Sequence, residues 1–213
     1  MRAARVLLSV DAIVFDCDGV LVDSAASVER SWRRWATHYD LDADTVLRSA
    51  PGWRTSDTAA AFLPAERVAE ACALIESIEL DDASHVRAIP GALELLASLP
   101  AHRWAVHTSA SRALFDARID AADLPRPRVA VTADDVARGK PDPEGYGSAL
   151  RHLGIAGDRA AVFEDTDSGI AAARSAGVAS SVRVGPGTSV AGEVAVVADL
   201  RSVTWDGRLG LIV

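Results

Sequence analysis

The chain contains little cysteine and has fewer basic than acidic side chains. Its two cysteines, Cys17 and Cys72, are too few for a disulfide framework. It has 22 lysines and arginines against 30 aspartates and glutamates, and its formal net charge at pH 7 is −8. This balance argues against nucleic acid and anionic membrane surfaces as partners, because both repel an acidic protein.

Long hydrophobic runs are also missing. The apolar run at residues 6–10 follows two arginines, but Asp11 ends it, so it is too short for a signal peptide or a membrane span. Neither an internal repeat nor a low-complexity linker is visible in the sequence. We therefore expect a cytoplasmic protein without a membrane partner.

The chain does have enough apolar residues for a core. Hydrophobic residues make up 49% of its 213 residues, which argues against general disorder. This length suits one core domain, or a core domain that carries a smaller insertion.

One short motif organises the chain. Residues 12–15 are continuously apolar and are typical of a buried strand in a parallel sheet. Asp16 and Asp18 follow directly, and Gly19 permits a turn that a side chain would obstruct. Two carboxylates this close repel each other, which favours a cation between them, and Mg²⁺ is the natural hard cation for oxygen ligands. Taken alone, the pattern also fits ordinary loop residues after a strand.

Residues 25–89 are predicted to be entirely helical. Trp32 and Trp35 recur at helical spacing, and shorter helical segments follow, with no strand candidate among them. The stretch therefore reads as a helical insertion into a core domain that is formed by residues 1–24 and 90–213.

Strand and helix signals alternate through the rest of the chain. The strand candidates are residues 103–107, 129–131, 160–163, a segment after Gly177, and 193–197. Strands that alternate with helices indicate βαβ units. The predicted fold class is therefore α/β, with a Rossmann-like parallel sheet flanked by helices.

Four polar clusters fall at the ends of these strands or in the loops beyond them. In chain order they are Asp16 with Asp18, Thr108 with Ser109, Lys140, and Glu164 with Asp165. Because the carboxyl ends of parallel strands share one edge of a sheet, we expect these clusters to converge. Each cluster alone has a simpler interpretation, as a helix cap, a solvated loop residue or a charge pair that suits a helix dipole. The complete ordered set is much harder to obtain by accident.

The chemistry of the four clusters is mutually consistent. Asp16 suits a carboxylate nucleophile, and Asp18 suits a general acid and base. Thr108 offers a hydroxyl to phosphate oxygens, and Lys140 offers a point charge that neutralises nucleophile and phosphoryl group. The acidic pair after residue 163 completes a magnesium site. Cys17 is an alternative nucleophile, but the sequence places no base beside it.

These motifs resemble those of the haloacid dehalogenase-type (HAD) phosphohydrolases. The matching segments are residues 16–24 (DCDGVLVDS), 108–109 (TS), 139–143 (GKPDP) and 163–169 (FEDTDSG). The resemblance covers essentially the whole chain and implies a Rossmann-like core with a small helical cap domain at residues 25–89. It further implies that Asp16 is the nucleophile and Asp18 the acid and base. Asp16, the backbone carbonyl of Asp18, and Asp165 would hold Mg²⁺, with Glu164 alongside.

The resemblance places Thr108 and Lys140 against the phosphoryl group, with Ser109 supplying a backbone N–H. Which of the two hydroxyls is the main phosphate ligand stays open. Within the family, the chain is similar to phosphatases of small sugar and polyol phosphates, which implies a small phosphorylated metabolite as partner. β-Phosphoglucomutases share the architecture, but they carry a histidine ten residues after the second aspartate, where this chain has Val28. A phosphomutase is therefore the first alternative, and a non-catalytic phosphate-binding module is the second.

Substrate selection is expected on the cap, at Gly52, Trp53 and Arg54 with Asp57. Trp53 suits stacking on the face of a sugar, and Arg54 suits pairing with an anionic or hydroxylated substrate. The alternative is that Trp53 packs within the cap and that Arg54 pairs with Asp57. His107 adjoins the phosphate loop and is a weak candidate for a role there. By resemblance, the protein is expected to be a monomer.

Overall fold

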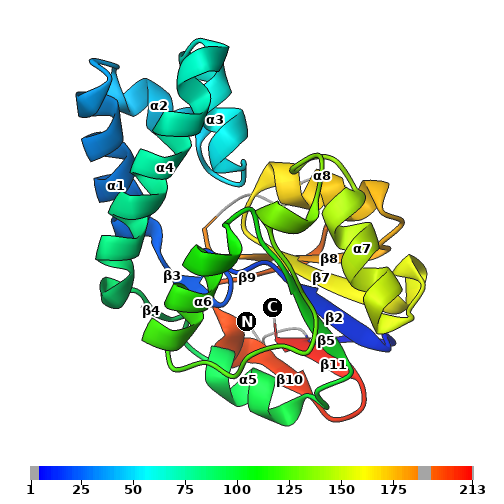
Figure 1. The fold of residues 1–213 in the computed structure, drawn as a ribbon. Helices are drawn as coiled ribbons and strands as arrows, with labels where there is room; N and C mark the ends of the chain where they lie inside the picture. Colours follow the sequence, from blue (N-terminus) through cyan, green and yellow to red (C-terminus); the bar gives the residue numbers. More distant parts are fainter. Residues whose placement is uncertain (1–4, 187–192, 213) are drawn as a thin grey trace.

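A six-stranded parallel sheet forms the centre of the computed structural model (Figure 1). The structure describes residues 5–186 and 193–212. The strand order is β6-β5-β2-β7-β8-β9. The strands are β2 (Ala12–Phe15), β5 (Trp104–His107), β6 (Ala130–Val131), β7 (Ala160–Glu164), β8 (Ser180–Val184) and β9 (Glu193–Val197). The prediction of a parallel α/β sheet is confirmed.

Helices cover both faces of this sheet. They are α5 (Ala92–Ser98) and α6 (Arg112–Ala121) on one face, and α7 (Glu144–Leu153) and α8 (Asp167–Ser175) on the other. Successive side chains of a strand point to opposite faces. Ile13 and Phe15 of β2 accordingly join the core beneath α5 and α6, whereas Val14 joins the core beneath α7 and α8. Every residue of β2 is buried, which explains its continuously apolar sequence.

Four further helices form a unit with a hydrophobic core of its own. They are α1 (Ala25–His38), α2 (Ala43–Ser49), α3 (Thr55–Phe62) and α4 (Ala65–Asp82). Trp32, Trp35 and Ile75 are central members of this core, so the helical spacing of the two tryptophans did mark a buried face. In Figure 1 this unit, drawn in blue to cyan-green, stands beside the sheet and its helices. We refer to α1–α4 as the helical unit.

A short antiparallel ribbon connects the helical unit to the sheet. Its strands are β3 (Val22–Asp23) and β4 (Arg87–Ala88), and Val22 pairs with Ala88. The prediction that residues 25–89 contain no strand is therefore wrong at β4. Two residues are too few to show the alternation that predicts a strand.

A second, three-stranded antiparallel sheet lies against the face that carries α5. It consists of β1 (Arg5–Leu8), β11 (Leu209–Ile212) and β10 (Val203–Trp205), in that order. The apolar run near the N-terminus thus belongs to a sheet edge. Four 3₁₀ helices complete the described elements: η1 (Ala83–His85), η2 (Ala133–Asp135), η3 (Gly157–Arg159) and η4 (Leu200–Ser202). Among the described residues, no helix has both the length and the apolar character needed to cross a membrane.

Candidate active site

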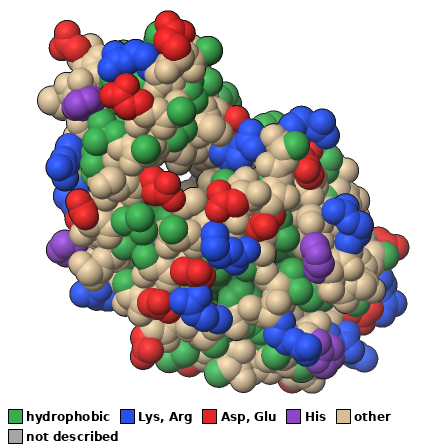
Figure 2. Space-filling model, viewed as in Figure 1, with side chains coloured by type: hydrophobic (Ala, Val, Ile, Leu, Met, Phe, Trp, Pro, Cys, Tyr) green, Lys and Arg blue, Asp and Glu red, His purple; other side chains and the backbone are tan. Residues whose placement is uncertain are grey.

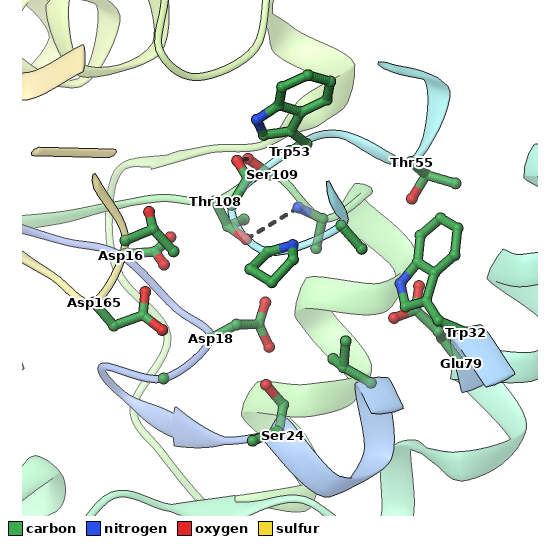
Figure 3. Close-up of a pocket in the computed structure, with 18 of the residues that line it drawn as sticks. Asp16, Asp18, Ser24, Trp32, Trp53, Thr55, Glu79, Thr108, Ser109 and Asp165 are labelled. Carbon is green, nitrogen blue, oxygen red and sulfur yellow. Dashed lines mark hydrogen bonds between the residues drawn. The ribbon is translucent and has the colours of Figure 1, made fainter. Parts of the chain in front are cut away.

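A cavity of about 390 Å³ lies between the carboxyl edge of the parallel sheet and the helical unit. The surface in Figure 2 is hollowed between the same two parts of the molecule. Figure 3 shows that the carboxylates of Asp16, Asp18 and Asp165 gather on one side, with Trp53 and Trp32 farther out. β2 ends at Phe15, β5 at His107 and β7 at Glu164, so the predicted polar clusters do converge at one edge.

Lys140 forms the centre of a buried ionic group on the floor of this cavity. Its Nζ lies 2.8 Å from Oδ1 of Asp16 and 2.5 Å from Oε1 of Glu164. All three residues are buried. Although burial disfavours its charged form, the two carboxylates hold the pKa of Lys140 above its ordinary value. The lysine is therefore a permanent cation beside the candidate nucleophile.

Glu164 has both carboxylate oxygens occupied. Tyr146 donates its hydroxyl to Oε1 at 2.9 Å, and the backbone N–H groups of Asp165 and Thr166 donate to Oε2 at 2.9 Å each. Gly169 allows this packing, because a Cβ there would lie 1.7 Å from Oε1. Burial opposes ionisation, but Lys140 and these donors hold the pKa of Glu164 below its ordinary value.

Asp16, Glu164 and Asp165 offer carboxylate oxygens that all lie within 4.8 Å of one another. Burial, then the Glu164 charge, raises the pKa of Asp165 to about 7, and burial also raises the pKa of Asp16 well above its ordinary value. Oδ1 of Asp165 is buried and has no hydrogen-bond partner among the described residues. Gly19 lets this side chain approach, because a Cβ there would lie 2.1 Å from Oδ2. These buried, under-neutralised oxygens fit a hard divalent cation.

Asp18 belongs to a second ionic group that the sequence did not predict. Nη1 of Arg118 in α6 lies 2.9 Å from Oδ2 of Asp18, and its Nη2 lies 2.9 Å from Oε1 of Glu79 in α4. Arg118 is 3% exposed and Glu79 is 4% exposed. The one available signal was helical register, because Arg118 shares the apolar face of α6 with Leu114 and Phe115.

The two neighbouring hydroxyls point to different partners. Thr108 is buried, lines the cavity and accepts a hydrogen bond from the backbone N–H of Ala110 at 3.1 Å (Figure 3). Ser109 instead donates its hydroxyl to the backbone carbonyl of Gly52 at 2.8 Å. Ser109 therefore joins the sheet edge to the helical unit, while the Thr108 hydroxyl stays near the carboxylates.

The structure divides the predicted substrate-binding residues of the helical unit. Gly52 and Trp53 line the cavity, and Trp53 is 41% exposed. Arg54 and Asp57 do not line it, because Nε and Nη2 of Arg54 bind the Asp57 carboxylate at 2.8 and 2.9 Å. Arg54 Nη1 also donates to the carbonyls of Val136 and Ala137. The pairing of Arg54 with Asp57 is the alternative interpretation of these two residues, and a role of either residue in substrate binding stays a prediction.

Two further candidates are structural. Cys17 is completely buried in the main core, and burial raises the pKa of its thiol well above the ordinary value, so it is no nucleophile. Nδ1 of His107 lies 3.1 Å from the carbonyl of Val131, and the ring packs edge-on against Tyr146. Burial, then the charge of Lys140, lowers the pKa of His107 to about 3, so the ring is neutral.

Comparison with known proteins shows the family to which the chain belongs. The chain is 37% identical over 169 residues to hexitol phosphatase A of Escherichia coli, covering 77% of this chain and 78% of that protein. It is 34% identical over 182 residues to glycerol-1-phosphate phosphohydrolase 1 of Saccharomyces cerevisiae, covering 80% and 73%. A hydrolase from Pseudomonas syringae has the same fold, with a TM-score of 0.80 at 23% identity over 89% of this chain and 94% of that one. Residues 10–177 match the model of the haloacid dehalogenase-like hydrolases, and the chain belongs to this family.

Proposed function

We propose that the protein is a Mg²⁺-dependent phosphatase that hydrolyses a small sugar or polyol phosphate through an aspartyl-phosphate intermediate. The observation that carries this proposal is the buried Asp16 carboxylate, held by Lys140 at the floor of a small cavity beside further carboxylates. The two similar proteins, a hexitol phosphatase and a glycerol-1-phosphate phosphohydrolase, support the substrate class. A cavity of about 390 Å³ suits a small substrate.

Asp16, Asp165 and the backbone carbonyl of Asp18 would hold the magnesium ion. Glu164 lies in the same acidic cluster, but its oxygens already accept hydrogen bonds. We therefore propose that Glu164 positions Lys140 and is not a ligand of the metal ion. When bound, the ion supplies positive charge that neutralises Asp16 and the phosphoryl oxygens together.

Hydrolysis then takes two steps. In the first, an Asp16 oxygen attacks phosphorus while the bond from phosphorus to the ester oxygen breaks, and Asp18 gives its proton to the departing alkoxide. In the second, the Asp18 carboxylate takes a proton from water, and that water attacks the same phosphorus and releases Asp16. Asp18 must be protonated for the first step, and one of its carboxyl oxygens can carry this proton while the other accepts a hydrogen bond from Arg118.

Other residues of the chain position the phosphoryl group and exclude water. Lys140 holds Asp16 and adds positive charge near the phosphoryl oxygens, and the Thr108 hydroxyl lies on the same side of the cavity. We propose that the helical unit, within residues 25–89, is a cap domain over a core formed by residues 1–24 and 90–213. The contact of Ser109 with Gly52 supports this, because it closes the cap loop onto the sheet edge.

The two alternatives find less support. Val28, at the position of the mutase histidine, lines the cavity with an aliphatic side chain that has no proton to transfer. A non-catalytic binding module would not need Asp16, Lys140 and Asp165 together in one buried cluster. That the enzyme acts as a cytoplasmic monomer stays a prediction.

The testing experiment is phosphate release from a panel of small phosphate monoesters, with Mg²⁺ and with a chelator. The panel contains hexose 1- and 6-phosphates, a hexitol phosphate, glycerol phosphates and phosphoglycolate. We expect release that depends on Mg²⁺ for a subset of the panel. Absence of release from every member would contradict the proposal, and a coupled isomerisation assay with a bisphosphate primer would then test the mutase. The Asp165→Asn variant should need more Mg²⁺ for half-maximal activity, and an unchanged titration would remove Asp165 from the metal site.

A further inference from the structure

The cavity has no unshared positive charge among the described residues that line it. Lys140 and Arg118 are the two cationic side chains in this lining. Lys140 lies between Asp16 and Glu164, and its charge serves the phosphoryl end of the site. Any cation for the rest of the substrate would therefore have to be Arg118.

Arg118 is already committed to two carboxylates. It binds Asp18 and Glu79 at 2.9 Å each, and burial keeps solvent from competing for these contacts. Glu79 itself lines the cavity, as does Glu29 of α1, an exposed side chain whose Oε1 accepts a hydrogen bond from Nε of Arg33 at 2.9 Å. We call the part of the cavity that lies away from Lys140, beside Arg118 and Glu79, the outer half. This part carries at least as much negative as positive charge.

The remaining wall is apolar, with a few hydroxyl groups. Val28, Trp32, Leu47, Trp53 and Leu114 supply its carbon surface. Trp32 and Trp53 lie on different sides of the cavity in Figure 3. The hydroxyls of Ser24 and Thr55 also line it, and both can donate or accept a hydrogen bond.

We propose that this cavity selects phosphate esters whose leaving group is an uncharged, hydroxylated carbon chain, and that it rejects esters bearing a second anionic group. The proposal rests on the proposed phosphatase function. A carboxylate or second phosphate in the outer half would meet the buried Glu79 carboxylate and would lose its water without gaining a free cation. An uncharged polyol meets apolar walls with its C–H groups and hydrogen-bonds through its hydroxyls.

Two matched pairs of esters test this inference. Glycerol 1-phosphate and 3-phosphoglycerate differ only in a terminal CH₂OH or carboxylate, and glucitol 6-phosphate and 6-phosphogluconate differ in the same way. We expect kcat/KM for the better neutral ester to exceed that of its carboxylate partner on the order of 100-fold, since like-charge contacts in a closed site are strongly unfavourable. Comparable values within a pair would overturn the inference while leaving the phosphatase intact. Absence of release from all four esters and from the wider panel would instead overturn the proposed function, and the inference with it.

The Glu79→Gln variant tests the source of the selectivity. It keeps the shape of the side chain but removes its charge, so we expect the ratio between neutral and carboxylate esters to fall about tenfold. Glu70→Gln changes an exposed glutamate on the same helix, and this control should leave the ratio within about twofold. An unchanged ratio in a folded Glu79→Gln protein would contradict the role of that charge. If this variant does not fold, the wild-type ratios still decide the inference.

Discussion

Two buried cations in this protein have the same number of partners but different surroundings. Lys140 lies between Asp16 and Glu164, and Arg118 lies between Asp18 and Glu79. The Glu164 carboxylate beside Lys140 accepts further hydrogen bonds from Tyr146 and from backbone N–H groups. Within the described part of the chain, Nε of Arg118 has no hydrogen-bond partner, whereas both carboxylate oxygens of Asp18 lie 2.9 Å from Nη1 of Arg118.

The two groups also differ in the parts of the molecule that they connect. Every member of the Lys140 group belongs to the sheet and its adjoining segments, whereas Glu79 comes from α4 of the helical unit. A fully satisfied buried network holds one geometry, and an incompletely satisfied one is costly and easier to rearrange. We infer that the Lys140 group is a fixed scaffold for the nucleophile, and that the Arg118 group changes its contacts during turnover.

The largest expected effect concerns the nucleophile in the Lys140 group. Asp16→Asn should lower kcat by at least about 10⁴-fold, because an amide does not form the aspartyl-phosphate. Phosphate release measures the loss, and circular dichroism shows whether the fold is retained. Asp81→Asn, at an exposed site on α4, is the control and should keep full activity. Substantial activity in a pure Asp16→Asn preparation would disprove the assignment.

Removing the cation of the fixed group should cost stability. Lys140→Met leaves Asp16 and Glu164 buried without their partner, so we expect the free energy of unfolding to fall by about 3–5 kcal/mol. Arg138→Met removes an exposed cation two residues earlier, where a surface ion pair contributes about 0–1 kcal/mol at most. Urea unfolding of both variants gives the comparison, and equal effects would show that the Lys140 group is not a scaffold.

His107, which lies close to the charge of Lys140, should make the stability of the protein depend on pH. His107 stays neutral in the folded protein down to about pH 3, whereas an unfolded histidine is protonated near pH 6.5, roughly the ordinary value. The unfolded state therefore binds more protons in this window, and stability falls by up to about 4 kcal/mol as the pH drops from about 6.5 toward 3. Unfolding free energies measured across this range should change less steeply in His107→Asn. The exposed His102→Gln should follow the wild type; a wild-type slope in His107→Asn would refute the assignment.

A smaller effect should come from the Arg118 group. Arg118→Met and Glu79→Met should each destabilise the protein, but the double variant should be less destabilised than the sum, with a coupling of about 1–3 kcal/mol. The reason is that each single change leaves an unpaired charge that the other removes. Urea unfolding of the wild type, the two single variants and the double variant measures this coupling free energy. Simple additivity would mean that the contact contributes nothing to joining α4 and α6.

The sequence predicted those site residues that follow strands. Asp16, Thr108 and Glu164 each come directly after a buried apolar segment or end it, and the topology of a parallel sheet brings such positions together. Arg118 and Glu79 lie within helices, where a charged residue is ordinary and only its burial reveals a role. Their meeting depends on the packing of α4 against α6, which no local pattern encodes.

The errors in the predicted fold have a related cause. The small sheet pairs Arg5 with Ile212, and an antiparallel contact between the two ends of a chain leaves no local signal in either segment. Arg54 pairs with Asp57, which is the alternative that the sequence also offered, because the two side chains lie three residues apart at the start of α3.

Both covalent connections between the helical unit and the sheet pass through the β3–β4 ribbon. Both chain crossings are hydrogen-bonded to each other there, and β3 begins four residues after Asp18. A rotation about this ribbon would separate Glu79 from Arg118 and Gly52 from Ser109 in one movement. Opening of the cavity would then break both contacts together and leave Arg118 with Asp18, so we expect turnover to slow as solvent viscosity rises.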